Sequence, residues 1–511
     1  MPLTFTDVVV VLLTVLFYVE YRNRQKLKSL PPGPKRLPLI GNILQMPTSL
    51  EWEVYARWGK ELNSDIIHLD VAGRSLVVIN SMKIANDLLD KRSSIYSDRP
   101  ILPMLHDLMG WEWLMSMAHY GELWKTQRRL FQQQFHPSNT AVYEDTVIEY
   151  VREFLSDVLD TPQNAITLSK RIPGGVALSL AYGFKVKRND DPFVKLVEDA
   201  LEPASLAAIP GAFLVDVFPF LKYVPEFVPG AGFKRKAKEW RQGMVAFKEG
   251  SFNEARSRLA LGNTRSSLTS RCLQLLDTTK AIEPQLEVIK NAAGMIYAAA
   301  SHTTISAIYT FFVAMLHYPD AMKKAQAELD SVIGHSRLPD FGDRENTPYI
   351  TAVLKEVLRW QPATPQAVPH RLMQNDAYDG YAFLAGTVFV PNVWAMLHNE
   401  DDYPDPMTFK PERFLDSDNR INHQIQDPSV MAFGFGRRIC AGMHIAEAIV
   451  WLTIASVLSS FDITPPIDDE GNKILPKLLY HSGISSYPQP FNAIFKPRSR
   501  DAESVIRAAE V

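Results

Sequence analysis

The chain has 511 residues, of which 46% are hydrophobic and 22% are charged, a composition typical of a globular protein with a large core. The formal net charge of −3 argues against a general affinity for nucleic acid, so no nucleic-acid partner is expected. Two cysteines exclude a disulfide-linked scaffold and suit a reducing compartment.

The first segment of the chain predicts a membrane anchor. Residues 3–19 are almost entirely apolar, and four basic residues follow them: Arg22, Arg24, Lys26 and Lys28. Positive charge on the C-terminal side of an apolar run places that side, and the chain after it, in the cytosol. A cleaved signal peptide would carry its positive charge before the run, so a retained anchor is favoured over a cleaved signal or an interfacial helix. We predict an anchor at 1–21 and a basic, proline-rich hinge at 22–36.

The rest of the chain predicts a mainly helical fold with minor β structure. Alternating apolar residues at 66–71 and 75–79 predict a small antiparallel sheet, and 387–390 is expected to add a strand to it. Helical periodicity covers most other segments: 148–159, 194–206, 237–256, 284–317, 319–333 and 349–361. We expect one large helical domain at 37–500, followed by a polar C-terminal tail at 501–511.

One of the two cysteines, Cys440, lies in a glycine-rich loop. Residues 433–442 read FGFGRRICAG, and the apolar segment 443–461 after them contains no proline or glycine and predicts a buried helix. Gly436 and Gly442 would let the main chain approach both the sulfur and a flat cofactor. A helix N-terminus beside the sulfur favours the thiolate, which is the form that binds a metal. The alternative is a buried, inert cysteine, which we expect for Cys272.

The spacing Phe-x-x-Gly-x-Arg-x-Cys-x-Gly resembles the haem-binding loop of the cytochrome P450 family. The resemblance implies that the Cys440 thiolate is the axial metal ligand of haem b, that Phe433 packs beside it, and that Arg438 pairs with a haem propionate. It also implies the family fold, which is one large helical domain with a subsidiary sheet, here after an N-terminal transmembrane helix. The anchor is similar to that of microsomal members. The stretches 120–124 and 233–240 are similar to fungal members of secondary metabolism.

Residues 299–304, which read AASHTT, resemble the family's groove over the haem iron. The resemblance places Ala299 and Ala300 beside the haem, and Thr303 and Thr304 at the family's threonine positions. Thr303 matches the threonine that helps protons reach dioxygen. His302 stands where the family has an acid. An imidazole can relay protons near neutral pH, but a packing or surface histidine is an equal alternative.

Further residues match family positions around the cofactor. The resemblance implies that Trp124 and Arg128 contact haem propionates, although an exposed basic helix is the alternative, and that His370 or Arg371 makes a similar contact. It also implies a buried structural network that supports the cysteine loop: Glu356, Arg359 and Arg413. Four segments would face the substrate: 101–117, 206–221, 363–368 and 483–488.

The predicted function is that of a membrane-anchored haem-thiolate monooxygenase which oxidises a lipophilic small molecule in fungal secondary metabolism. A terpenoid is the first expectation, ahead of an indole or a polyketide aromatic. The chain contains no dinucleotide-binding motif, so electrons from NADPH would come through a separate NADPH-cytochrome P450 reductase, with cytochrome b5 as a further donor. We expect a monomer at the endoplasmic reticulum membrane with its catalytic domain in the cytosol. The alternatives are an isomerase or dehydratase and a non-catalytic haem-binding protein.

Overall fold

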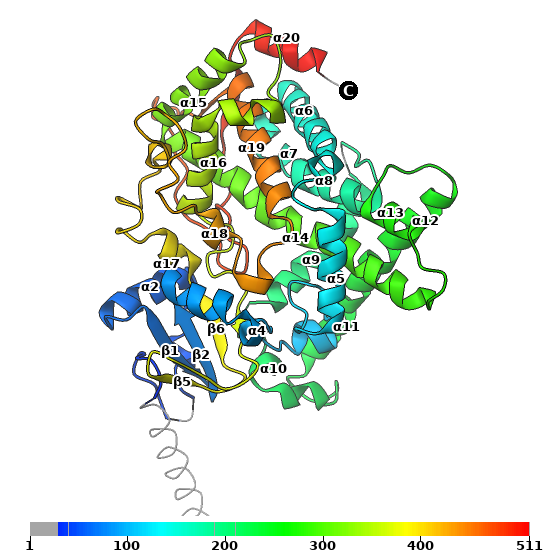
Figure 1. Cartoon of the computed structure of the whole chain (residues 1–511), viewed down its shortest axis with the longest axis vertical. Helices are drawn as coiled ribbons and strands as arrows, with labels where there is room; N and C mark the ends of the chain where they lie inside the picture. Colours follow the sequence, from blue (N-terminus) through cyan, green and yellow to red (C-terminus); the bar gives the residue numbers. More distant parts are fainter. Residues whose placement is uncertain (1–28, 39, 189, 210, 510–511) are drawn as a thin grey trace, which may run out of the picture.

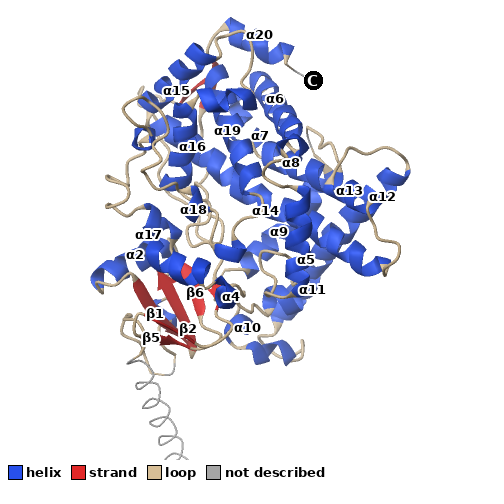
Figure 2. Cartoon of the chain, viewed as in Figure 1, coloured by secondary structure: helices blue, strands red, loops and turns tan. Residues whose placement is uncertain are grey.

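The computed structural model describes residues 29–38, 40–188, 190–209 and 211–509. The predicted anchor and the first part of the predicted hinge lie outside the described residues. Helices make up most of the described body, and strands β1, β2, β5 and β6 lie together at one end of it (Figures 1 and 2). The prediction of a mainly helical fold with minor β structure is confirmed.

The helices before the longest one are α2 (Glu51–Glu61), α3 (Met82–Ala85), α4 (Ser93–Tyr96), α5 (Glu122–Gln134), α6 (Glu144–Asp160), α7 (Ala165–Leu168), α8 (Arg171–Tyr182), α9 (Pro192–Ala207), α10 (Leu214–Val217), α11 (Gly232–Val245), α12 (Ser251–Ala260) and α13 (Leu268–Gln274). The remaining helices are α14 (Ile282–His317), α15 (Pro319–Val332), α16 (Pro348–Trp360), α17 (Val393–Leu397), α18 (Ser429–Ala432), α19 (Met443–Ser460) and α20 (Arg500–Ala508). Short helical turns that matter for the site are η2 (Asn86–Lys91), η3 (Met104–Leu108), η6 (Pro219–Tyr223) and η10 (Gly436–Arg438).

Helix α8 has no counterpart among the predicted helices. Its sequence contains Pro173, Gly174 and Gly175, which disfavour a helix when they are judged by propensity alone. In the structure α8 packs between α6 and α14, and a Cβ on Gly175 would come within 2.2 Å of the Tyr150 ring. The glycine is therefore needed for close helix packing, and tertiary contact overrides the weak local preference.

The main sheet has the strand order β1-β2-β6-β3. Strands β1 (Ile66–Val71) and β2 (Arg74–Ile79) pair antiparallel, because a two-residue turn at Ala72 and Gly73 joins them. Strand β6 (Val388–Pro391) pairs parallel with β2, and β3 (His370–Arg371) pairs antiparallel with β6. The prediction of an antiparallel sheet is therefore wrong for β6, since no turn dictates the direction of a strand that returns from so far along the chain.

Two smaller pairs of strands complete the β structure. Strands β4 (Asp376–Tyr378) and β5 (Tyr381–Phe383) pair with each other, as do β7 (Phe461–Thr464) and β8 (Ile494–Pro497). Residues 501–511 were expected to form a polar tail, but up to Ala508 they belong to α20. This helix buries Ile506, and Arg507 pairs with Asp160 of α6 at 2.6 Å. The amphipathic pattern of α20 gives it an apolar face, and this face packs against the body of the protein.

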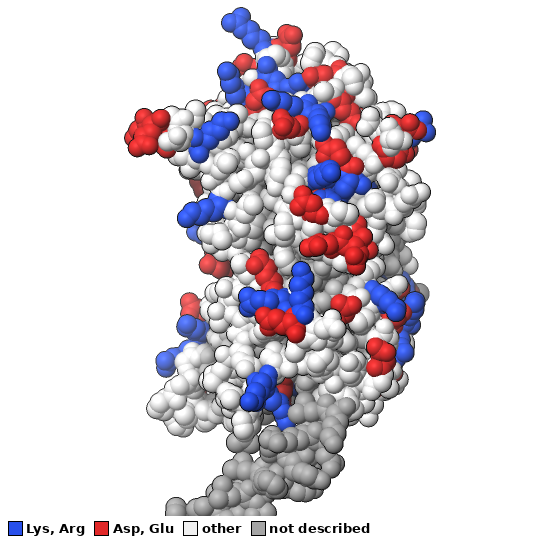
Figure 3. Space-filling view, turned by 90° about the vertical axis from the view of Figure 1, so that its left-hand side faces the viewer, with Lys and Arg blue, Asp and Glu red and all other residues white. Residues whose placement is uncertain are grey.

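Helices α14 and α19 form the centre of the body. Within the described ranges, these two helices are long and apolar enough to cross a membrane, but most of each is buried inside the body. They are therefore core helices, and α14 contacts α5, α8, α16 and α19. On the face shown in Figure 3, acidic and basic side chains are interspersed, with no region dominated by one sign.

Candidate functional site

Cys440 lies between η10 and the first turn of α19. The Cys440 backbone N–H donates to the Phe433 carbonyl at 2.8 Å, which closes the loop into a tight turn. Gly436 has φ +54°, and a Cβ there would come within 2.2 Å of the Leu89 carbonyl of η2. The structure therefore explains Gly436 by loop packing against η2 rather than by room for a cofactor. At Gly442 nothing lies within 4 Å of a built Cβ, so this position does leave open space.

The Cys440 thiol faces an internal space. Its side chain has accessible surface although burial within the fold raises the pKa of the thiol. The same pattern occurs in α14, where residues 298–303 are partly accessible although their neighbours on both sides are buried. Ala299 and Ala441 pack against one small cluster made of Met115, Ala118, Trp124 and Met295. The fold therefore brings the middle of α14 to the cysteine loop, as the sequence predicted.

Burial raises the pKa of the Cys440 thiol above its ordinary value. The Gly442 N–H and the Arg128 guanidinium act in the opposite direction, because both favour a negative sulfur. The loop alone therefore does not make the thiolate the favoured form, contrary to the expectation from the helix N-terminus. A bound metal cation would supply the missing stabilisation, since a coordinating thiol is deprotonated by the ion.

Three buried or half-buried arginines surround this space. Arg438 donates to the carbonyls of Ser97, Met115 and Ala118, and its guanidinium lies 4.5 Å from the Trp124 ring centre. Arg99 donates to the carbonyls of Ser116, Val368 and Pro369. Arg128 donates to the Ile439 carbonyl, next to Cys440, at 2.7 Å. Trp124, Arg128 and Arg438 therefore lie together around the cysteine loop.

None of these three guanidiniums forms an ion pair with a carboxylate of the described chain. Burial lowers the pKa of Arg438 to about 10 and that of Arg99 well below its ordinary value, which shows how costly the charges are in place. A ligand that carries two negative charges would offset this cost. Haem, with two propionates, fits both this cluster of cations and the thiol in front of it.

Arg99 was missed by the sequence reasoning. It lies in a loop directly after Asp98, and no local pattern distinguishes it from an exposed arginine. Only its contacts with the carbonyls of Val368 and Pro369, far along the chain, identify it. The one indication in the sequence is Pro100, because a residue that precedes proline, here Arg99, is restricted to extended backbone conformations.

The structure also separates the roles of His370 and Arg371, which the sequence left open. His370 is buried, and its Nδ1 lies 2.7 Å from the Tyr96 carbonyl. Burial, with Arg99 and Arg438 nearby, holds the pKa of His370 well below its usual range. Arg371 instead pairs with Asp98 at 2.9 Å and is partly exposed. His370 is therefore a neutral ring beside the cationic cluster, whereas the charge of Arg371 is already balanced by Asp98.

The predicted catalytic residues lie on different sides of α14. The Thr303 hydroxyl donates to the Ala299 carbonyl at 2.7 Å, so Thr303 shares the face of Ala299, towards Cys440. The stripe Tyr297, Ser301, Ile305 and Tyr309, turned by about 200° from that face, lines a separate cavity of about 770 Å³. His302 also lines this cavity. Thr304 is buried within the core, and Ala300 packs against the main core cluster.

Glu356, Arg359 and Arg413 form the predicted buried network. Arg359 pairs with Glu356 at 2.7 Å, and Arg413 pairs with the same carboxylate at 3.1 Å. The remaining guanidinium N–H groups donate to the carbonyls of Leu397, Pro404, Asp405 and Thr408. The network ties α16 to the chain segment at 397–413, and within the described residues none of its hydrogen bonds or ion pairs reaches Cys440.

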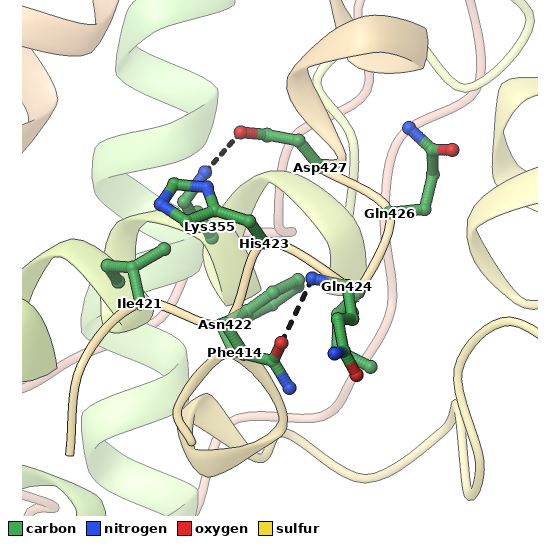
Figure 4. A pocket seen from close by; sticks show the side chains of 9 residues that line it. Lys355, Phe414, Ile421, Asn422, His423, Gln424, Gln426 and Asp427 are labelled. Carbon is green, nitrogen blue, oxygen red and sulfur yellow. Dashed lines mark hydrogen bonds and ion pairs between the residues drawn. The ribbon is translucent and has the colours of Figure 1, made fainter. Parts of the chain in front are cut away.

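A second, smaller pocket of about 230 Å³ lies beside α16 (Figure 4). Phe414 and the loop 421–427 line it together with Lys355, which pairs with Asp427. The Asn422 side chain accepts from the Gln424 N–H at 2.9 Å, so the loop satisfies its own polar groups. None of the predicted site residues lines this pocket.

Comparison with known proteins agrees with the site. The family model described as "Cytochrome P450" matches residues 31–495. The cytochrome P450 monooxygenase ple1 of Rhodocybe pseudopiperita is 43% identical, over 96% of this chain and 94% of its own length. Cytochrome P450 monooxygenase 98 of Postia placenta is 40% identical, over 97% of this chain and 96% of its own, and a tryptamine 4-monooxygenase of Psilocybe cyanescens is 35% identical, over 97% and 98%. The chain therefore belongs to the cytochrome P450 family of haem-thiolate monooxygenases.

Proposed function

We propose that this protein is a membrane-anchored monooxygenase of fungal secondary metabolism that holds its haem through Cys440 and oxidises a lipophilic small molecule, with a terpenoid as the first substrate class. The observation that carries the proposal is an accessible thiol beside three arginines, Arg99, Arg128 and Arg438, that form no ion pair with a carboxylate of the described residues. Phe433, Gly442 and Ala299 would border the ring, while Arg99, Arg128, Arg438 and His370 would hold its propionates. When bound, haem supplies the activation of dioxygen and the transfer of one oxygen atom.

The test of this assignment is spectroscopic. Purified protein should retain haem, and its reduced carbonyl complex should show the red-shifted Soret band of a thiolate ligand. Cys440→Ala should abolish that band, whereas Cys272→Ala is the matched control and should leave it unchanged, since Cys272 is buried elsewhere and burial raises its thiol pKa to about 11. A red-shifted band in Cys440→Ala would refute the assignment.

The two sides of α14 suggest how protons reach the site. Burial and the nearby Lys170 lower the pKa of His302, so its ring is neutral near neutral pH and offers one donor and one acceptor. Thr303 uses its own proton on the Ala299 carbonyl, which leaves the hydroxyl lone pairs free to accept on the Cys440 side. We assign His302 to proton uptake in the cavity and Thr303 to accepting a hydrogen bond beside Cys440, which would hold a protonated oxygen ligand in place there.

This assignment can be tested by coupling efficiency, the product formed per NADPH consumed. His302→Leu and Thr303→Ala should both divert NADPH into peroxide, and His302→Asp, which restores the acid of other family members, should recover product. His481→Leu is the control, because His481 lines the same cavity but lies on a different element. Equal coupling in His302→Leu and His481→Leu would contradict the relay.

Membrane contact is supported by one end of the described body. Large apolar side chains are exposed there: Leu37, Ile40, Leu44, Leu214, Phe220, Tyr223 and Phe227. Figure 1 places α10 at the same end as β1, β2 and the start of the described chain. Basic residues Lys234, Arg235 and Lys236 follow on α11, and such a pattern suits lipid tails flanked by anionic headgroups. With the predicted anchor, this surface supports a location at the endoplasmic reticulum membrane.

Electrons would come from NADPH through a separate reductase, as P450 monooxygenases use redox partners.

An indole amine is the second substrate candidate, because one relative is named a tryptamine 4-monooxygenase. Spectral titration with a sesquiterpene hydrocarbon and with tryptamine separates the two, since a ligand near the iron shifts the Soret band. Product formed without NADPH and reductase would instead identify an isomerase or dehydratase, and no product under any condition a non-catalytic haem protein.

A further inference from the structure

The cavity on the His302 side of α14 is large enough for a ligand of its own. It has a volume of about 770 Å³ and lies between α8, α9, α14 and the chain at 487–493. Binding sites for small molecules measure about 300–1,000 Å³. Two polar groups of its lining have no hydrogen-bond partner in the part of the chain that the structure describes, the Ser301 hydroxyl and the His302 ring.

The basic residues of the lining fall into two kinds. Arg171 and Arg188 pair with Asp157 of α6 at 3.1 and 3.2 Å, so their charges are balanced within the protein. Lys170 and Lys187 form no ion pair within the described ranges. The cavity therefore contains positive charge that the fold itself leaves without an anion.

The acidic residues of the lining lie on the α9 side of the cavity: Asp190, Asp191 and Glu198. The pKa of Tyr297 is raised by burial and by the charges of Glu198 and Asp191, whereas that of His302 is lowered by burial and by the charge of Lys170. Tyr297 and His302 are five residues apart on α14, which is about 7.5 Å along the helix. The cavity therefore has an acidic end and, beside His302, a cationic end.

Aromatic rings line the cavity further along α14. Tyr309 meets Phe491 edge-on, with 6.0 Å between the ring centres, and the rings of His481 and Tyr487 are 4.7 Å apart. Tyr309 follows His302 by seven residues, or about 10.5 Å along the helix. A flat aromatic ligand packs well against such rings. An acid group and a ring of about that length would therefore meet the cation and the rings together.

We propose that this cavity is a second binding site, for an aromatic carboxylic acid whose carboxylate pairs with Lys170 beside His302 and whose ring lies against Tyr309 and Phe491. The ligand brings to α14 an acid such as other family members carry at the position of His302. Hydrogen-bonded to the His302 ring, its carboxylate favours the protonated imidazole, so the ligand acts as an effector of proton uptake. Binding is independent of the reaction, whereas the effect on turnover rests on the proposed function.

Isothermal titration calorimetry with 2-naphthoate tests the site. The haem-containing protein is first saturated with 4-phenylimidazole, which occupies the space beside Cys440 and leaves the cavity open. One equivalent of 2-naphthoate should bind about tenfold more tightly than the uncharged 2-naphthamide, because only the acid forms a charge-assisted contact with Lys170. Acetate, which has the charge but no ring, should also bind about tenfold more weakly than 2-naphthoate.

Variants locate the ligand within the cavity. Lys170→Met should weaken 2-naphthoate about tenfold and leave 2-naphthamide unchanged. Lys195→Met is the matched control, because Lys195 is an exposed lysine of α9 outside the lining, and it should match the wild type. His302→Asp places a carboxylate beside Lys170 and should weaken 2-naphthoate by competition for the same cation. Ser301→Trp fills the cavity and should abolish binding of both compounds, while an intact Soret shift with 4-phenylimidazole shows that the variant is folded.

Three results would overturn the site: equal affinity of the wild type and Lys170→Met for 2-naphthoate, equal affinity of the wild type for 2-naphthoate and 2-naphthamide, and acetate binding as tight as that of 2-naphthoate. During turnover, 2-naphthoate should raise the product formed per NADPH in the wild type but not in Lys170→Met. Unchanged coupling with binding intact would refute the effector role. Failure of the proposed function would look different, since the Soret shift with 4-phenylimidazole would be missing while calorimetry still reported on the cavity.

Discussion

Two groups of buried arginines in this molecule are stabilised in different ways. Arg359 and Arg413 share the carboxylate of Glu356, so their charges are balanced inside the protein. Arg99, Arg128 and Arg438 lie beside Cys440, and within the described residues they contact carbonyl oxygens and the rings of Tyr120 and Trp124 but form no ion pair. The charges of the first group are balanced by Glu356, whereas those of the second group would be balanced by a bound anion such as the haem propionates of the proposed function. Sequence motifs contain every member of the two groups except Arg99, but only the partners in the structure show which charges are balanced inside the protein.

Removing the shared carboxylate should have the largest effect. Glu356→Leu leaves two guanidiniums without an anion, and an uncompensated buried charge costs about 3–5 kcal/mol of the free energy of unfolding. Thermal and urea unfolding of the variant measure the loss. The double variant Glu356→Leu with Arg359→Met removes one of those charges and should regain part of the stability; a double variant no better than the single one would contradict this account.

Removing a cation from the second group should act on haem rather than on the fold. Arg128→Met should raise the rate of haem loss to apomyoglobin about tenfold, equivalent to about 1.4 kcal/mol, because one propionate partner is gone. The unfolding free energy of the haem-free variant should stay within about 1 kcal/mol of the wild-type value. The substitution removes one hydrogen bond, which destabilises the fold, and one unpaired buried charge, which stabilises it. Arg129→Met, on the exposed side of the same helix, is the control, and equal haem loss in both variants would be the contrary result.

The two groups of arginines each lie beside a buried histidine, and the unfolding free energy at acid pH should distinguish them. His398 stacks on Trp394, and burial, together with Arg359, lowers its pKa to about 3. A histidine with a lowered pKa binds fewer protons in the folded than in the unfolded protein, so the free energy of unfolding falls as the pH is lowered below the ordinary histidine value of about 6.5. Between about pH 6.5 and pH 5.5 the loss should be about 1 kcal/mol.

The same loss is expected for His370, whose pKa is lowered by burial and by Arg99. His398→Gln and His370→Gln should each flatten the unfolding free energy over this pH range. Bound haem should reduce the pH dependence that comes from His370 but not the one that comes from His398. The haem propionates would lie among the arginines that lower the pKa of His370 and would offset their positive charge. A haem effect on the His398 contribution would argue against the separation of the two groups.

The smallest effect is expected at Arg371. This arginine lies next to the second group but pairs with Asp98 and is partly exposed. Arg371→Gln should change the rate of haem loss by less than about twofold, since a partly exposed ion pair contributes about 0–1 kcal/mol. Haem loss as fast as in Arg128→Met would place Arg371 among the propionate partners after all.

Much of the fold could be predicted where the signal is local. The helices at 319–333 and 349–361 begin at or beside Pro319 and Pro348 and end within one residue of the predicted positions, because proline and apolar periodicity both act within a few turns. Helix α8 was missed because Gly174 and Gly175 serve neighbours that are distant in sequence. The parallel direction of β6 was missed for the same reason, since pairing with β2 is a long-range contact.

By itself, the amino-acid sequence predicted which residues would carry the chemistry, because the cysteine loop, the threonine of α14 and the Glu356–Arg359 pair are short motifs whose spacing needs no distant partner. Only the tertiary structure decided how these residues are used. It set Thr303 and His302 on different sides of α14, paired Arg371 with Asp98, and added Arg99 to the cations beside Cys440. Charge balance and burial depend on contacts between segments far apart in the chain, and no local pattern records them.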